Sequence, residues 1–146
     1  MKVYRIERKK YLKHTLLGHG AALSKGFRWN SEDTRLVYTS ESRALAYLEV
    51  AVHLDLSVDL PSDRFLIEIE IPDDLTALEV ELYDLPENWD HKPPLTLTQN
   101  IGDDFVMQNE AAVLKVPSCI IPQESNFLIN PLHPEAQRIQ VVKQQP

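Results

Sequence analysis

The chain has 146 residues, of which 43% are hydrophobic and 25% charged, a composition typical of a globular domain. This length predicts a single domain over residues 1–146. No apolar run reaches the roughly 18 residues that a membrane-spanning helix needs, and the N-terminus has no signal-peptide core. We therefore expect a cytoplasmic protein that does not contact a membrane.

The net charge of −7 argues against a general nucleic-acid binder, so we expect no direct contact with nucleic acid. The charges are unevenly distributed. Residues 1–28 contain eight Lys or Arg and one acid, whereas the remainder contains seven basic and 21 acidic side chains. This asymmetry predicts either a positive patch where an anionic ligand enters or a basic segment folded against acidic neighbours. Composition alone does not choose between them.

The first half of the chain is predicted to combine short strands with one helix. Residues 2–7 and 36–38 have strand-forming patterns, and the two glycines in residues 18–20 indicate a flexible connection between them. The helix follows a serine-rich turn and is expected to end within residues 53–55. Its candidate N-caps are Thr39, Ser40 and Ser42.

The second half predicts more strands and one further helix. The helix is expected over residues 101–110, after an irregular, proline-rich connection over residues 85–97. Alternating apolar residues make 64–71 the clearest strand. Weaker strands are expected over residues 78–83, 111–116 and 138–142, and residues 118–121 and 126–129 are expected to form short strands or bends. Strands dominate and the few helices are irregularly placed, which indicates an α+β fold.

Glu49 occupies an unusual position on the first predicted helix. Leu48, Val52 and Leu56 lie within about 60° of Leu45 on a helical wheel, and Glu49 lies about 40° from it, at the edge of this apolar face. A carboxylate near a core costs several kcal/mol unless it has a partner. The nearest candidate cation in the sequence is Arg28.

The residue types that bind metals or act as nucleophiles form no recognisable motif. Glu49 and His53 have i, i+4 spacing and can reach one ion, but no further ligands accompany them, so we expect no metal. His133, between two prolines, is interpreted as orienting a turn by hydrogen bonding. The single Cys119 excludes an internal disulfide and is interpreted as a buried filler rather than a nucleophile.

Four blocks in the chain resemble the signature segments of the RES-domain toxins of bacterial toxin–antitoxin pairs. They are residues 26–31 (GFRWNS), 37–54 (VYTSESRALAYLEVAVHL), 116–118 (VPS) and 124–134 (ESNFLINPLHP), in the family's order. The family's arginine, glutamate and serine correspond to Arg28, Glu49 and Ser118. Its tyrosine corresponds to Tyr38, and its E-x-N pattern ends at Asn126. One departure is Phe27, where a small residue commonly precedes the arginine.

The resemblance implies a fold and an activity. The fold is ADP-ribosyltransferase-like, with a mixed β core and a few short helices. The activity is cleavage of the nicotinamide–ribose bond of NAD by hydrolysis or phosphorolysis, with NAD as substrate and no metal. At least some members of the family resemble transferases that ADP-ribosylate a protein. The implied partners are a cognate Xre-type antitoxin and a second copy of the chain, as a homodimer within a toxin–antitoxin complex.

The resemblance also implies roles for individual residues. Glu49 stabilises the oxocarbenium-like centre, Arg28 contacts the pyrophosphate or orients Glu49, and Tyr38 stacks on the nicotinamide. Ser118 and Asn126 provide donors to the ribose or the carboxamide. The residues alone are also consistent with structural roles. Arg28 and Glu49 can form a structural ion pair. The other three can be a core aromatic (Tyr38), a turn cap (Ser118) and a loop contact (Asn126). The resemblance leaves a second enzymatic function open, a protein mono-ADP-ribosyltransferase. The non-enzymatic alternative is a binding module that recognises an anionic ligand through Arg28 and the basic N-terminal segment.

Overall fold

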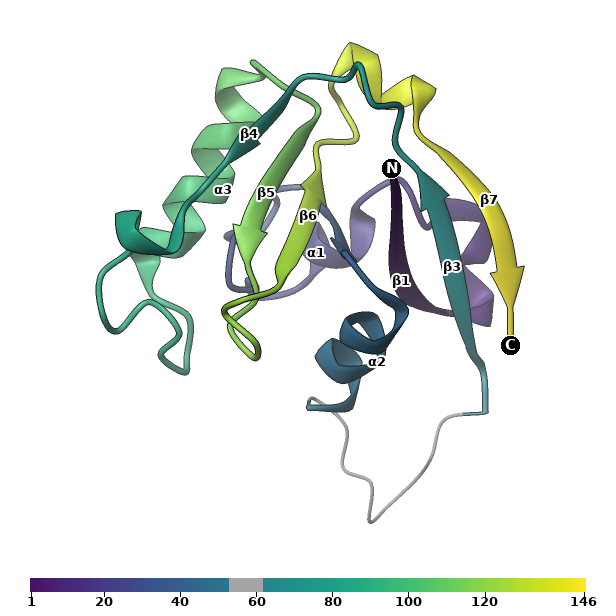
Figure 1. The fold of residues 1–146 in the computed structure, drawn as a ribbon, viewed down its shortest axis with the longest axis horizontal. Helices are drawn as coiled ribbons and strands as arrows, with labels where there is room; N and C mark the ends of the chain where they lie inside the picture. Colours follow the sequence, from purple (N-terminus) through teal and green to yellow (C-terminus); the bar gives the residue numbers. More distant parts are fainter. Residues whose placement is uncertain (53–61) are drawn as a thin grey trace.

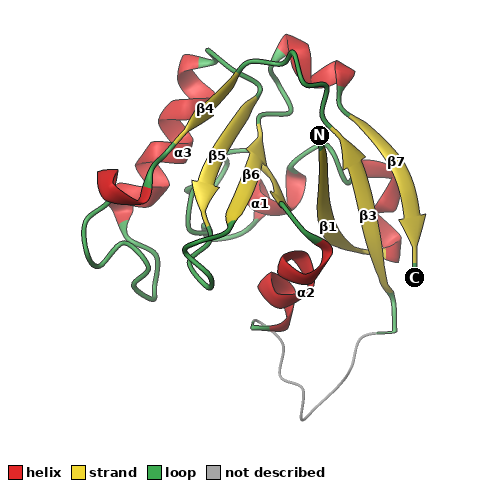
Figure 2. Ribbon diagram, viewed as in Figure 1, coloured by secondary structure: helices red, strands yellow, loops and turns green. Residues whose placement is uncertain are grey.

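The computed structural model describes residues 1–52 and 62–146, which form one mixed sheet with short helices around it (Figures 1 and 2). The described residues form seven strands in the order β4-β5-β6-β2-β1-β3-β7. Among these described strands, only β4 and β5 pair in parallel. The strands are β1 (Lys2–Arg8), β2 (Val37–Ser40), β3 (Arg64–Glu70), β4 (Ala77–Glu79), β5 (Val113–Pro117), β6 (Ser125–Ile129) and β7 (Gln140–Gln145). The predicted α+β class is therefore confirmed.

Three α-helices and three 3₁₀ helices are found in the described residues, and Figure 1 shows α3 beside β4 and β5, at the opposite end of the sheet from β7. Helix α2 packs on β1 and β2. The helices are α1 (His19–Leu23), α2 (Arg43–Ala51), α3 (Thr96–Gln108), η1 (Lys9–His14), η2 (Leu82–Asp84) and η3 (Pro134–Arg138). None of the helices in this part of the chain has the length and apolar character needed to span a membrane.

Apolar side chains fill both faces of the sheet. One cluster gathers residues of β1, β2, β3, β5 and β6 on one face, including Val3, Val37 and Ile129. A second cluster lies where α3 and the aromatic Trp29 pack against β5 and β6. Strand β3 is buried on both faces. Ile67 is buried on one face, and Leu66, on the opposite face, packs with Ala46 of α2. The expected one-sided strand over residues 64–71 is therefore two-sided.

Several predicted boundaries differ from the structure for local reasons. The glycines near residue 20 do not form a flexible connection; Gly18, with φ +71°, precedes helix α1. The strand expected over residues 78–83 ends at Glu79, and η2 follows with Glu81 and Asp84 capping each other. Residues 118–121, expected as a short strand or a bend, form a bend.

The second predicted helix and the last strand are longer than expected. Helix α3 begins at Thr96, five residues before the predicted start, and ends where Asn109 adopts a left-handed conformation with φ 54°. Strand β7 continues to Gln145, because its polar residues pair with β3 at the edge of the sheet. Val52, expected on the apolar face of α2, is 42% exposed. The predicted positions His53 and Leu56 lie outside the described residues.

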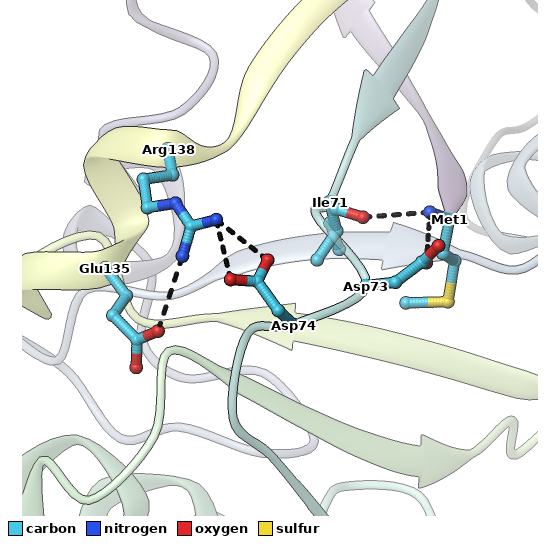
Figure 3. Close-up of polar contacts among 6 residues, drawn as sticks. All are labelled: Met1, Ile71, Asp73, Asp74, Glu135 and Arg138. Carbon is cyan, nitrogen blue, oxygen red and sulfur yellow. Dashed lines mark hydrogen bonds and ion pairs between the residues drawn. The ribbon is translucent and has the colours of Figure 1, made fainter.

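Ion pairs join the segments that meet beyond one end of the sheet (Figure 3). Arg138 of η3 donates to both carboxylate oxygens of Asp74, at 2.7 and 2.9 Å. The amino group of Met1 donates to Asp73 and to the carbonyl oxygen of Ile71, both at 2.8 Å. These exposed contacts hold the turn after β3 to the segments on either side of it.

Candidate active site

A cavity of about 900 Å³ opens between β1 and β2, a volume within the range of small-molecule sites. Four of the five predicted site residues line it: Arg28, Tyr38, Glu49 and Asn126. The fifth, Ser118, is fully buried and contacts Glu49 from behind the cavity wall. The fold thus brings residues separated by up to 98 positions into one site.

Glu49 is directed into the cavity by helix α2. Ser42 caps this helix, because its Oγ accepts a hydrogen bond from the Leu45 amide at 3.1 Å. Two neutral donors meet on one carboxylate oxygen of Glu49: Ser118 Oγ donates to Oε1 at 2.8 Å and Asn126 Nδ2 donates to it at 2.7 Å. These bonds satisfy Oε1 and fix the orientation of the partly buried carboxylate.

Arg28 does not form an ion pair with Glu49, so the nearest cation in the sequence is not the partner of this carboxylate. Arg28 Nη1 instead donates to the carbonyl oxygens of Trp89, at 3.1 Å, and His91, at 2.9 Å. The Arg28 Nε is buried and has no acceptor within the described residues. Arg28 therefore ties the proline-rich connection to the cavity wall. Lys92 of this connection also lines the cavity.

Ser118 is held in position by the turn that follows β5. Its Oγ accepts hydrogen bonds from the amides of Ile120 and Ile121, at 3.1 and 3.2 Å. With these two donors on the oxygen, the hydroxyl proton is directed to Glu49. The turn and the orientation of Glu49 thus depend on the same hydroxyl.

Asn126 is oriented from the neighbouring strand. It lies opposite Ser40 in the β2–β6 pair, and its Oδ1 accepts a hydrogen bond from Ser40 Oγ at 2.9 Å. The ionised carboxylate of Glu49 only accepts hydrogen bonds, so the Nδ2 group of Asn126 faces Glu49 and its Oδ1 faces Ser40. Ser40, expected only as a possible helix cap, is therefore part of the site.

Tyr38 has its ring at the cavity and its hydroxyl in a buried network. The hydroxyl donates to Asn30 Oδ1 at 2.5 Å and accepts from the Trp29 amide at 3.2 Å. Burial raises the pKa of Tyr38 above its ordinary value of 10.0, which keeps the hydroxyl neutral. The edge-on ring of Phe27 lies 5.5 Å away, centroid to centroid. The unusual Phe27 thus contributes to the same wall.

Residues that support the Arg28 loop were missed in the sequence. Asn30 is fully buried and its Nδ2 donates to the Ala21 carbonyl oxygen at 3.1 Å. Asp103 of α3 accepts from the amide of Ser31 at 3.0 Å and from its hydroxyl at 2.5 Å. The only sequence signal was the polar turn over residues 30–33, which indicated side-chain-to-backbone bonding without naming its partners.

His133, Cys119 and the possible metal ligands do not form a further site in the described residues. The Nδ1 of His133 accepts from the Glu135 amide at 3.0 Å and caps η3, which confirms that it orients a turn. Cys119 is partly buried and packs at the edge of the second apolar cluster. Across residues 1–52 and 62–146, no three His, Cys, Asp or Glu side chains are grouped to hold a metal ion. His53, which has i, i+4 spacing to Glu49 and was not expected to bind a metal, lies outside these ranges.

The model of the RES domain family matches residues 2–146, so the chain belongs to this family. It is 44% identical over 130 residues to the Prs ADP-ribosylating toxin of a Sphingobium species, covering 88% of this chain and 80% of that protein. It is 38% identical over 133 residues to the Toxin Res of Yersinia enterocolitica, covering 91% and 86%. The predicted RES-domain toxin is thus confirmed.

A solved structure has the same fold. The similarity is to the MbcT–MbcA toxin–antitoxin complex of M. tuberculosis, with a TM-score of 0.76, and covers 99% of this chain and 82% of the matched chain. The sequence identity is 16%, so this similarity concerns the fold alone.

Proposed function

We propose that this chain is the toxin of a toxin–antitoxin pair and that it cleaves the nicotinamide–ribose bond of NAD in the cavity between β1 and β2. Its relatives are named toxins, and one of them is named as ADP-ribosylating. The observation that carries the proposal is the carboxylate of Glu49. It faces a cavity of suitable size while Ser118 and Asn126 both donate to its Oε1.

This arrangement suits a reaction that develops positive charge. When the bond from ribose C1′ to the pyridinium nitrogen breaks, its electron pair moves to that nitrogen and neutral nicotinamide leaves. The sugar becomes oxocarbenium-like, as in glycoside hydrolysis. A carboxylate fixed beforehand stabilises this charge without reorganising during the reaction. The acceptor then forms the new bond to C1′, and an acceptor that carries a proton on the attacking oxygen, such as water, releases it to solvent.

The other site residues have complementary roles in this proposal. Arg28 already uses Nη1 for two carbonyl oxygens and its Nε is buried, so Nη2 is the donor suited to the pyrophosphate of NAD. Tyr38 offers its ring to the nicotinamide while its hydroxyl stays in the Asn30 contact. Ser118 and Asn126 act on NAD through Glu49, because their donor groups are directed to its carboxylate.

The acceptor of ADP-ribose separates the candidate activities. Water gives hydrolysis and inorganic phosphate gives phosphorolysis. A protein side chain gives mono-ADP-ribosylation, a second candidate favoured by the name of the 44% identical relative. A module that only binds an anion is the non-enzymatic alternative, and Arg28 with the basic N-terminal segment supports it.

A nicotinamide-release assay distinguishes these functions. Purified protein is incubated with NAD, with and without phosphate and with and without cell lysate. Release that requires neither addition indicates hydrolysis, and release that requires phosphate indicates phosphorolysis. Label transferred only to a lysate protein indicates the transferase. NAD that remains intact in every arm contradicts the enzymatic proposal and favours the binding module.

The proposal includes partners and a location. A cytoplasmic enzyme that degrades NAD harms its own cell, so a cognate antitoxin of the Xre type is expected to hold it inactive. A solved structure with this fold comes from a toxin–antitoxin complex. We further propose a homodimer within such a complex, with contacts to nucleic acid made by the antitoxin. Light scattering of the isolated toxin and of the copurified pair tests the stoichiometry.

A further inference from the structure

The sheet is almost divided between β1 and β2. These strands pair at one position only, Tyr4 opposite Ser40, whereas β1 and β3 pair at seven positions. Continuing the antiparallel register would place Ile6 opposite Tyr38. In these described strands that pair is not formed, and the gap opens into the cavity, which is lined by residues from both faces of β1.

Arg5 crosses this gap. Its Nη1 donates to the carbonyl oxygen of Tyr38 at 2.9 Å, and its Nη2 donates to Glu7 at 2.8 Å. Thr15 Oγ1 donates to the same oxygen of Glu7 at 3.1 Å. The Arg5 and Glu7 side chains are 20% and 12% exposed, so this is a largely buried cluster in the cavity wall.

The position of the hydrogen bond from Arg5 to Tyr38 indicates its structural role. A backbone carbonyl in the interior needs a donor, and a neighbouring strand normally supplies it. Where β1 and β2 separate, the long side chain of Arg5 supplies that donor to Tyr38 across the gap. The guanidinium does so although its Nε is buried without an acceptor in the described part of the chain. A buried ion pair of this kind is weak evidence for stability by itself.

We propose that Arg5 is a positioning residue that fixes the width of the cavity by holding β2 at a set distance from β1. Glu7 and Thr15 hold the guanidinium in the orientation that reaches the Tyr38 carbonyl oxygen. Arginine suits this role because its planar fork reaches two acceptors in fixed directions, which the single ammonium group of lysine does not. The consequence for catalysis rests on the proposed NAD site, whereas the effect on β2 does not.

The simpler explanation is that Arg5 only neutralises Glu7, and two variants separate these roles. Arg5→Met combined with Glu7→Gln removes both charges, so no buried charge is left unpaired, but the Tyr38 carbonyl oxygen loses its donor. Arg5→Lys keeps a positive charge beside Glu7 and loses the fork. The matched control is Arg64→Met, because the Arg64 side chain is 24% exposed, is paired with Asp63 and lies outside the cavity lining.

Two measurements test the role of Arg5. Amide hydrogen exchange of residues 37–40 without NAD is expected to be about tenfold faster in both Arg5 variants than in wild type and the control. The KM for NAD is expected to rise about tenfold with a smaller change in kcat, because Arg5 does not touch the reacting atoms. Wild-type exchange in Arg5→Lys would show that charge alone suffices and would overturn the proposal.

The outcomes remain separable if one part fails. If wild-type protein consumes no NAD, the proposed function is wrong, and hydrogen exchange without NAD still decides the role of Arg5. If the double variant does not fold, Arg5→Lys still decides it. Faster exchange with an unchanged KM would contradict the claim that the spacing of β1 and β2 sets the NAD site.

Discussion

Gly102 of helix α3 gives the sharpest prediction, because secondary-structure propensity and tertiary contact have opposite effects there. Helix propensity alone predicts that Gly102→Ala stabilises the protein by up to about 1 kcal/mol. A Cβ added at Gly102, however, would lie 1.5 Å from the carbonyl oxygen of Trp29 and 2.7 Å from its carbonyl carbon. These are backbone atoms of the loop that carries Arg28, and they cannot rotate out of the way.

The contact sets the expected magnitude. Ordinary van der Waals contact begins at 3.4 Å. To accommodate the added Cβ, α3 and the loop that carries Arg28 must therefore separate by roughly 2 Å. Overpacking a closed interface costs about 1–3 kcal/mol, and the rigid partner here argues for the upper end. After subtraction of the helix-propensity gain, Gly102→Ala should lower the free energy of unfolding by about 2 kcal/mol. For a chain of this length, that corresponds to a Tm about 4–8 °C lower.

Urea and thermal unfolding measure this effect, and Gly20→Ala is the matched control. Gly20 is also a helical glycine, in α1, but a Cβ there meets no atom within 4 Å. Gly20→Ala should therefore leave stability unchanged or raise it by up to about 1 kcal/mol. If Gly102→Ala were as stable as Gly20→Ala, the close packing of α3 on the Arg28 loop would be refuted.

Four further outcomes follow from the geometry of the site and the fold. Glu49→Gln keeps an oxygen for both donors but loses the charge, so NAD turnover should fall at least about 10²-fold, with little change in calorimetric NAD affinity or the urea midpoint. Ser118→Ala leaves two amides without their acceptor, so urea unfolding should show a loss of about 1–3 kcal/mol, together with a lower kcat. Arg28→Ala should weaken NAD binding at least about tenfold in calorimetry, because it removes the charged donor expected at the pyrophosphate. The hydrogen bonds from Arg138 lower the pKa of Asp74 from its ordinary value of 3.8. Their stabilisation is therefore present above that pH and is lost as the pH falls through the lower folded-state pKa, so Arg138→Gln should flatten the acid dependence of the urea midpoint.

Each of these predictions has a contradicting result. Near-normal turnover in Glu49→Gln would rule out the charge-stabilisation mechanism. Unchanged stability in Ser118→Ala would show that the turn does not depend on its hydroxyl. Full NAD affinity in Arg28→Ala would place the pyrophosphate contact elsewhere; Arg43→Ala, which removes an arginine outside the cavity lining, is its control. Identical acid profiles in wild type and Arg138→Gln would exclude that ion pair as a source of the pH dependence.

Local sequence was sufficient where local physics decides the structure. The alternating apolar residues of β3 and the serine cap of α2 were readable because strand pairing and helix starts have short-range signals. The start of α3 was not readable, because its Thr, Asn, Gly and Asp residues are weak helix formers. The helix is buried through Gly102 and Phe105, which pack in the Trp29 region. The packing of α3 through Gly102 and Phe105 outweighs the weak helix propensity of its sequence.

The sequence by itself determined that a carboxylate at position 49 needs a partner, because its place on the helix brings a charge toward the core. Only the tertiary structure decided what that partner is. Ser118 and Asn126 lie 69 and 77 residues away, and the pairing of β2 with β6 and the turn after β5 bring them to Glu49. Arg28, nearer in the chain, faces the carbonyl oxygens of residues 89 and 91 instead. Contacts between distant segments depend on the register of the strands, and no local pattern records that register.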